Sequence, residues 1–178
     1  MMGKGKLKDN TVVTTVMANI GFHKAIKENG GRTEITAVGD RYVLENMLAN
    51  GYNLGGEQSG HIIFTDFSTT GDGPVTALQV LSYLKRTRHK ASAITKIMTS
   101  YPQLLVNVKV ATKDGWEDNE AIKASIEEGK QQLGENGRIL VRPSGTEPLI
   151  RVMAEGPDQK ELEEICYKIA DVVKAQQG

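Results

Sequence analysis

The order of secondary-structure signals at the start of the chain restricts its fold more than any other feature. Residues 11–17 read Thr-Val-Val-Thr-Thr-Val-Met, a short β-branched run that is typical of a buried strand. An apolar pattern with helical spacing follows at residues 20–27, and the same pair of signals repeats at residues 34–38 and 42–50. This alternation predicts a parallel sheet covered on both faces, with ligands binding in the loops that follow the strands.

After a predicted helix at residues 91–98 the pattern changes near Pro102, which predicts a domain boundary. Residues 105–110 alternate valines with polar side chains, as in an antiparallel sheet with one solvated face. A helix, two strands and a last helix are predicted after them. Asp158 is predicted to cap the last helix, and Cys166 lies on its apolar stripe and is therefore predicted to be in the core. We therefore predict an α/β three-layer domain with a mainly parallel sheet at residues 1–103. A smaller two-layer α+β domain with an antiparallel sheet is predicted at residues 104–178.

Residues 142–151 read Arg-Pro-Ser-Gly-Thr-Glu-Pro-Leu-Ile-Arg and form a turn between two predicted strands. The hydroxyl groups of this turn and the backbone N–H groups of residues 144–146 can converge on one point, flanked by two arginines. An oxyanion such as phosphate would satisfy all these donors. The alternative is a polar hairpin whose arginines pair with Glu147 and Glu155. The candidate phosphate-binding residues are Arg142, Ser144, Gly145, Thr146 and Arg151.

A second candidate site is the Gly-rich segment at residues 55–61, Gly-Gly-Glu-Gln-Ser-Gly-His. A dinucleotide-binding motif needs a helix after its glycines, and here a strand is predicted instead. In an extended segment Glu57, Ser59 and His61 would point the same way, and a carboxylate beside a hydroxyl suits the vicinal hydroxyls of a sugar. The alternative is a tight turn with a surface glutamate and a histidine that is simply hydrogen-bonded.

The composition excludes several classes of function. The 22 basic residues balance the 22 acidic ones, so no basic field attracts nucleic acid or an acidic membrane surface. The single cysteine, Cys166, excludes a disulfide framework and fits the cytoplasm, and no apolar run is long enough for a membrane span. The three histidines lack zinc spacing, and Asp72 is predicted to cap a helix, so we expect no metal site.

Together the two loops resemble those of the α-D-phosphohexomutase family. Residues 55–61 resemble the sugar-recognition loop of the family's third domain, and residues 142–148 resemble the phosphate loop of its fourth domain. The neighbouring segments 38–43 and 150–155 are similar as well, so the likeness covers nearly the whole chain. The resemblance implies that the phosphate loop clamps the non-reacting phosphate of a hexose phosphate. It implies sugar or cleft contacts for Glu57, Ser59, His61, Asp40 and Arg41.

The resemblance also implies what this sequence lacks. Members of the family use a phosphoserine on the first domain and a Mg²⁺ ion bound by an Asp-Gly-Asp-x-Asp-Arg loop of the second, and neither motif occurs here. We therefore expect no catalytic residue in this chain, which resembles the carboxyl-terminal, substrate-holding half of such an enzyme. Its implied partners are a hexose phosphate, the missing amino-terminal domains and, optionally, a second copy in a homodimer. A hexose 1,6-bisphosphate is the implied intermediate.

Two positions indicate a branch of the family. Related phosphomannomutases carry Gly-His where this chain has Gly39-Asp40 and a lysine where it has Met17, which favours a hexosamine phosphate as substrate and a hexosamine 1,6-bisphosphate as intermediate. Two alternatives stay open at this point. The chain could belong to another phosphohexomutase, or it could be a non-catalytic module that binds sugar phosphates.

Overall fold

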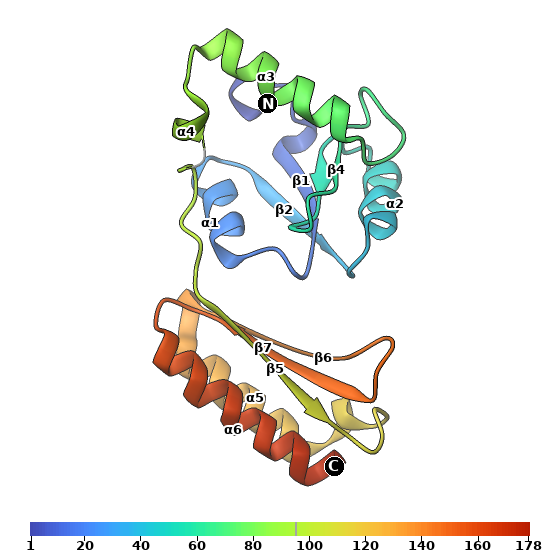
Figure 1. Cartoon of the computed structure of the whole chain (residues 1–178), viewed down its shortest axis with the longest axis vertical. Coiled ribbons are helices and arrows are strands. Elements are labelled where there is room, and N and C mark those ends of the chain that lie inside the picture. The colour runs from blue at the N-terminus through green and yellow to red at the C-terminus, as the bar shows by residue number, and fades with distance from the viewer. Residues whose placement is uncertain (95) are drawn as a thin grey trace. The chain divides into compact units, whose positions relative to one another are not determined.

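The computed structural model describes residues 1–94 and 96–178. They form two compact units, Met1–Ser100 and Tyr101–Gly178 (Figure 1). The first has a mixed, mostly parallel sheet with helices and the second a smaller antiparallel sheet with helices, which confirms the predicted fold class. The transition lies close to the predicted boundary, and the division of roles between the units stays a prediction.

The first unit follows the predicted alternation of strands and helices. Its strands are hydrogen-bonded in the order β2-β1-β3-β4, with β1 parallel to both β2 and β3 and with β4 antiparallel to β3. The elements are η1 (Met2–Lys4), η2 (Lys8–Asn10), β1 (Thr11–Thr15), α1 (Ile20–Glu28), β2 (Arg32–Thr36), α2 (Asp40–Asn50), β3 (Gly55–Gly56), β4 (Ile62–Ile63), α3 (Gly73–Thr87) and α4 (Ala91–Ile94).

The central strand β1 is buried along its whole length. Val13 is fully buried and packs with Val43 and Met47 of α2. Val12 points to the opposite face, where it lines a cavity together with Phe22 of α1. Figure 1 accordingly shows α1 and α2 on opposite sides of β1 and β2. The β-branched run thus forms the middle layer of three, as its burial on both faces requires.

Two elements of this unit have bounds that differ from the prediction. β2 lies at Arg32–Thr36 instead of residues 34–38, because it pairs residue by residue with the whole of β1. The residues after it are therefore free to form the loop that leads into α2. α4 ends at Ile94, whereas the sequence predicts a helix as far as residue 98; residue 95 lies outside the described part of the chain.

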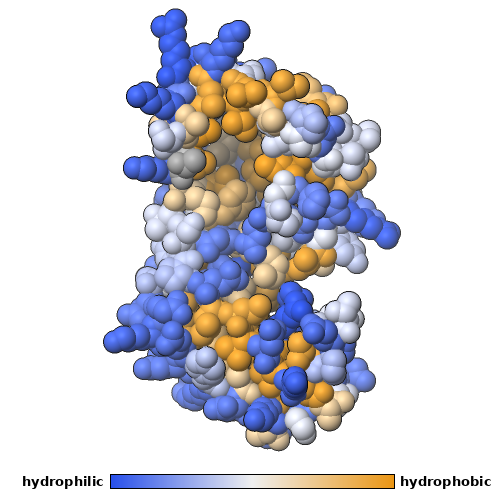
Figure 2. Space-filling model, in the orientation of Figure 1, coloured by the Kyte–Doolittle hydropathy of each residue, from blue (hydrophilic) through white to orange (hydrophobic). Residues whose placement is uncertain are grey.

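Helix α3 contributes little to the core. Its N-cap is Asp72, whose Oδ1 accepts a hydrogen bond from the Val75 N–H at 2.8 Å, which confirms the predicted capping role. None of its residues is buried, and Leu78 and Leu81 remain 63% and 59% exposed. Figure 2 shows hydrophobic side chains gathered at this end of the first unit. No element among the described residues therefore buries the apolar side chains of α3.

The second unit is a two-layer α+β domain. Its antiparallel strands have the order β5-β7-β6, and Figure 1 shows α5 and α6 on one side of this sheet. The apolar stripe of α6 packs with the buried side chains of β7 to form the core. The elements are β5 (Gln103–Lys109), η3 (Trp116–Asp118), α5 (Glu120–Leu133), η4 (Gly134–Asn136), β6 (Arg138–Pro143), β7 (Leu149–Glu155) and α6 (Gln159–Gln177).

Polar contacts fix the start of α6 and the end of the β6–β7 hairpin that lies opposite its turn. Asp158 caps the helix by accepting from the N–H groups of Lys160 and Glu161, as the sequence predicts. Glu155, at the end of β7, is fully buried and forms an ion pair with Arg138 of β6 at 2.7 Å. This pair joins the two strands at the end of the hairpin opposite its turn.

The buried thiol of Cys166 provides a test of the core. Burial raises the pKa of this thiol to about 11, so at pH 8 roughly one thiol in a thousand is ionised. We expect Cys166 in the native chain to react with iodoacetamide at least about a hundredfold more slowly than in urea-denatured chain. Equal rates in the two states would contradict its placement in the core.

Candidate functional site

The β6–β7 hairpin brings two arginines directly opposite each other. In its antiparallel register Arg142 pairs with Arg151, and the Ser144 N–H donates to the Leu149 carbonyl at 2.8 Å to close the turn. Like charges at directly opposed positions destabilise a sheet. The hairpin would therefore gain stability from an anion bound between the two guanidinium groups.

The same turn holds polar atoms that lack partners. Ser144 is only 2% exposed, and its Oγ has no hydrogen-bond partner among the described residues. The buried Nε of Arg151 likewise lacks an acceptor. The N–H groups of Gly145 and Thr146 take part in no hydrogen bond within residues 96–178, and both residues are exposed. Buried polar groups without partners are costly, so the presence of two of them at one hairpin indicates a site completed by a ligand.

The charge balance of the turn favours an anionic ligand. Burial lowers the pKa of Arg142, and the neighbouring positive charge of Arg151 lowers it further. Arg151 forms an ion pair with Glu147 through Nη2 at 3.3 Å, and Glu155 forms its ion pair with Arg138. No carboxylate of the described residues forms an ion pair with Arg142. The alternative, in which both arginines of the hairpin pair with Glu147 and Glu155, is therefore correct only for the pair of Arg151 with Glu147.

One predicted donor is unavailable, and one contact was not predicted. The Ser144 N–H closes the turn instead of pointing at a ligand, so the expectation for this group is wrong. The Nζ of Lys113 donates to the Ser144 carbonyl at 2.7 Å from a segment 31 residues earlier. The motif at residues 142–151 gives no signal of this contact, because the contact depends on how β5 pairs with β7.

The Gly-rich segment forms a tight hairpin between β3 and β4. The Glu57 N–H donates to the His61 carbonyl at 2.9 Å, and the Gly60 N–H donates to the Glu57 carbonyl at 3.1 Å. Gly60 has φ 103°, which favours glycine. The extended conformation expected for residues 57–61 is therefore wrong. Gly55 serves packing, because a Cβ there would overlap Met47 of α2.

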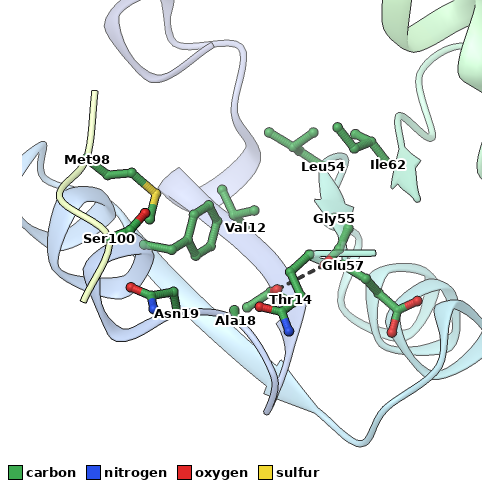
Figure 3. Close-up of a pocket in the computed structure, with 13 residues that line it drawn as sticks. Val12, Thr14, Ala18, Asn19, Leu54, Gly55, Glu57, Ile62, Met98 and Ser100 are labelled. Carbon is green, nitrogen blue, oxygen red and sulfur yellow. Dashed lines mark hydrogen bonds between the residues drawn. The ribbon is translucent and has the colours of Figure 1, made fainter. Parts of the chain in front are cut away.

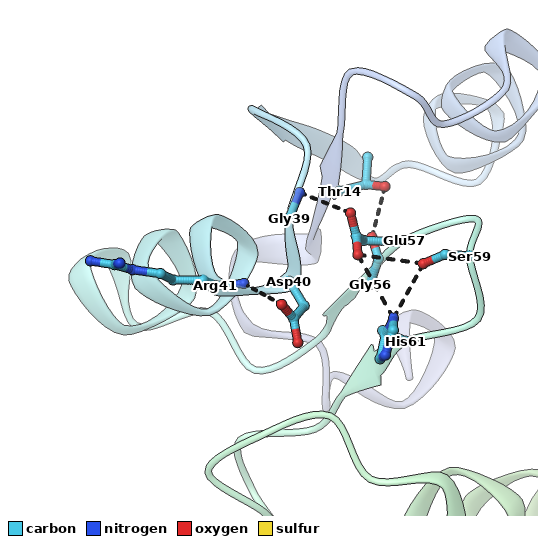
Figure 4. A network of polar contacts seen from close by, with 8 residues as sticks. All are labelled: Thr14, Gly39, Asp40, Arg41, Gly56, Glu57, Ser59 and His61. Atoms are coloured by element: carbon cyan, nitrogen blue, oxygen red, sulfur yellow. Dashed lines mark hydrogen bonds and ion pairs between the residues drawn. The ribbon is translucent and has the colours of Figure 1, made fainter. Parts of the chain in front are cut away.

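The turn nevertheless gathers the three predicted side chains (Figure 4). The Ser59 Oγ lies 3.4 Å from Glu57 Oε2 and 3.3 Å from His61 Nδ1, and that nitrogen lies 3.9 Å from Glu57 Oε2. The other carboxylate oxygen of Glu57 accepts from the Gly39 N–H at 3.0 Å. One oxygen of the Glu57 carboxylate is thus fixed by the backbone, and the other lies beside a hydroxyl and an imidazole. Such a group can exchange hydrogen bonds with sugar hydroxyls.

Asp40 and Arg41 lie at the start of α2, beside this network (Figure 4). The carboxylate of Asp40 accepts from the Arg41 N–H at 2.8 Å. The Arg41 guanidinium is bound to Glu45 at 2.7 Å and is 81% exposed, and its hydrogen bond to Glu45 raises its pKa. The structure thus brings Asp40 near the network and leaves the Arg41 side chain outside it.

A cavity of about 450 Å³ lies beside Glu57 on the face of the sheet that carries α1 (Figure 3). Its walls are mainly apolar, and the sequence gives no sign of it because its residues come from separated segments. They include Val12, Thr14, Ala18, Phe22, Leu54, Ile62, Met98 and Ser100. Among the described residues no group of three or more His, Cys, Asp or Glu side chains could hold a metal ion. No helix among them is long and apolar enough to span a membrane.

Comparison with protein families identifies both units. Residues 1–101 match the domain described as "Phosphoglucomutase/phosphomannomutase, alpha/beta/alpha domain III". Residues 105–172 match "Phosphoglucomutase/phosphomannomutase, C-terminal domain". The two matches agree with the resemblance of the two loops to the third and fourth domains.

Curated relatives align with almost the whole chain. A protein of Brevibacillus brevis named phosphoglucosamine mutase is 57% identical over 176 residues, which is 99% of this chain and 39% of the relative. A protein of the same name from Streptococcus gordonii is 54% identical over 177 residues, 98% of this chain and 39% of the relative. The chain thus spans about two fifths of the length of these relatives.

Solved structures agree on the fold. N-acetylphosphoglucosamine mutase of Aspergillus fumigatus superposes with a TM-score of 0.81 at 23% identity, over 97% of this chain and 39% of that one. A second structure of that enzyme, in complex with GlcNAc-6P and magnesium, has a TM-score of 0.78 at 22% identity, over 98% and 40%. At these identities the likeness shows the fold alone.

The ion pair between Glu147 and Arg151 leads to a test of the turn. Glu147→Gln removes the carboxylate that competes with an anion for Arg151. Because Glu147 is 56% exposed, the gain is modest, and we expect inorganic phosphate to bind about two- to fivefold more tightly in a calorimetric titration. Glu135→Gln, at an exposed position in η4, should leave binding unchanged. Weaker binding by the Glu147 variant would instead mean that this carboxylate holds Arg151 in place for the ligand.

Proposed function

This chain belongs to the phosphoglucomutase/phosphomannomutase family, and on that premise we propose that it is the substrate-holding part of a phosphoglucosamine mutase. The full-length enzyme would interconvert glucosamine 6-phosphate and glucosamine 1-phosphate for the synthesis of UDP-N-acetylglucosamine and the cell wall. The observation that carries this proposal is the opposition of Arg142 and Arg151 in a hairpin whose turn holds the buried Ser144 hydroxyl, which has no partner among the described residues. The names of the curated relatives support the choice of sugar.

The proposed role of the β6–β7 turn is to hold the phosphate that does not react. Phosphoryl transfer depends mainly on positioning and charge stabilisation, and a mutase must present both ends of one sugar to the same phosphoryl donor. The other phosphate is then the constant handle. Its three terminal oxygens suit the two guanidinium groups, the Ser144 hydroxyl and the N–H groups of Gly145 and Thr146, which have no acceptor within residues 96–178.

The proposed role of the β3–β4 turn is to hold the sugar. Glu57 is the principal acceptor, because its side chain is only 12% exposed and one oxygen of its carboxylate is fixed by the Gly39 N–H. Ser59 can both donate and accept, so it can hold sugar hydroxyls in either orientation of the substrate. His61 and Asp40 lie beside these two side chains. Arg41 would have to leave Glu45 before its guanidinium could take part.

The chemical step would use groups outside this sequence. We propose that a phosphoserine and a Mg²⁺ ion on amino-terminal domains supply it, with hexosamine 1,6-bisphosphate as the intermediate. A solved relative whose complex contains GlcNAc-6P and magnesium supports the ion and the ligand class. This chain's own residues would bind and orient the substrate. A homodimer and a cytoplasmic location stay predictions.

An NMR titration of the ¹⁵N-labelled chain tests the assignment of the two turns. Inorganic phosphate, glucosamine 6-phosphate and mannose 6-phosphate should all shift the amides of Gly145 and Thr146. Only the glucosamine ester should also shift residues 57–61. Arg142→Ala should weaken phosphate binding about ten- to a hundredfold, because it removes a charge-assisted contact.

Arg86→Ala is the matched control for this titration, because Arg86 lies on the exposed helix α3 of the other unit and should not affect phosphate binding. If none of the three ligands shifts Gly145 or Thr146 at millimolar concentration, the phosphate assignment is wrong. Equal shifts at residues 57–61 with both sugar phosphates would overturn the choice of glucosamine.

A separate prediction concerns catalysis. We expect the purified 178-residue chain to show no mutase turnover at any Mg²⁺ concentration, because its sequence contains no phosphoserine motif and no Asp-Gly-Asp metal loop. A coupled assay of glucosamine 1-phosphate formation measures this, with the full-length Brevibacillus relative as the positive control. Turnover by the pure chain would show that another group can donate the phosphoryl group.

A further inference from the structure

Lys113 reaches the phosphate turn from outside the motif. It follows β5, in a segment tied to the hairpin by the hydrogen bond from the Val110 N–H to the Pro148 carbonyl at 3.1 Å. Its half-buried side chain ends at the Ser144 carbonyl, 2.7 Å from Nζ, which is short and typical of a charge-assisted hydrogen bond. No carboxylate of the described residues forms an ion pair with Lys113, so its charge adds to that of the turn.

This contact fixes the peptide unit between Ser144 and Gly145. The carbonyl of this unit, that of Ser144, accepts from Lys113 Nζ at 2.7 Å. The preceding peptide unit is held separately, because the Ser144 N–H donates to the Leu149 carbonyl at 2.8 Å. In a planar trans peptide the C=O and the following N–H point in opposite directions, so binding the carbonyl from one side turns the Gly145 N–H to the other. That N–H has no acceptor within residues 96–178.

The contact also strengthens the donor. A cation bound to a carbonyl polarises its peptide group, and hydrogen bonds in series reinforce one another. The Gly145 N–H is therefore more positive than that of an ordinary turn. A Cβ at Gly145 would meet nothing within 4 Å, so the packing of the fold does not require glycine there. Because glycine has no Cβ, a ligand can approach its N–H closely.

We propose that Lys113 is a positioning residue for the phosphate turn: its ammonium group holds the Ser144 carbonyl so that the Gly145 N–H is preformed and polarised for a phosphate oxygen. The inference rests on the proposed phosphate-binding function of this turn. It adds a residue that acts through the backbone of Ser144 and Gly145 and that need not touch the ligand.

Lys113→Met tests the proposal, and Lys109→Met on β5 is the matched control. Lys109 is exposed, lies in the same unit and loses the same charge. We expect Lys113→Met to weaken inorganic phosphate binding about tenfold, as the loss of a hydrogen bond to a charged group predicts, and Lys109→Met less than about twofold. In the ligand-free chain only Lys113→Met should move the Gly145 amide proton upfield, because the peptide loses its polarising cation.

The outcomes separate the two proposals. If the unaltered chain binds phosphate and both variants bind it equally well, the positioning role is wrong while the phosphate site stands. If the unaltered chain does not bind phosphate, the proposed function fails first. Lys113→Gln, which can still donate to the carbonyl, should keep the Gly145 amide closer to its original position than Lys113→Met does. Identical spectra of the Gln and Met variants would show that the hydrogen bond does not orient the peptide.

Discussion

The register between β6 and β7 is the constraint on which the second unit's candidate site depends. A shift of one residue would exchange the two faces of the sheet and separate Arg142 from Arg151. The register is held at one end by the buried pair of Glu155 with Arg138 and at the other by the Ser144 bond to Leu149. The ion pair at one end of the hairpin thus helps to hold a register in which Arg142 and Arg151 repel each other at the other end. A bound anion would reduce that repulsion.

The candidate site of the first unit likewise combines a group that is fixed by the fold with a group that is available to a ligand. β1 is paired on both sides and buried on both faces, so it fixes β3 and the turn that follows. The carboxylate of Glu57 is anchored through one oxygen to Gly39 of the neighbouring loop. The other oxygen faces Ser59 and His61. In the first unit a backbone N–H fixes the functional carboxylate, and in the second unit hydrogen bonds to the N–H and the carbonyl of Ser144 fix the turn.

The sequence predicts what depends on local pattern and misses what depends on tertiary pairing. The two fold classes, the caps at Asp72 and Asp158 and the core position of Cys166 follow from periodicity and capping chemistry, and the structure confirms them. Lys113 and the cavity beside Glu57 could not be predicted, because their contacts join separated segments. The extended form expected for residues 57–61 is wrong because Gly60 closes a tight turn.

The exposure of α3 has a consequence for how stability is distributed in the first unit. A helix of 15 residues is marginal in water without packing, and this one buries none of its side chains. Its cap at Asp72 secures only the first turn. Opening α3 therefore exposes little additional apolar surface, whereas opening β1 disrupts the whole sheet. We therefore expect the helix and the strand to open in separate cooperative units, with the amides of α3 exchanging their hydrogens with solvent long before those of β1.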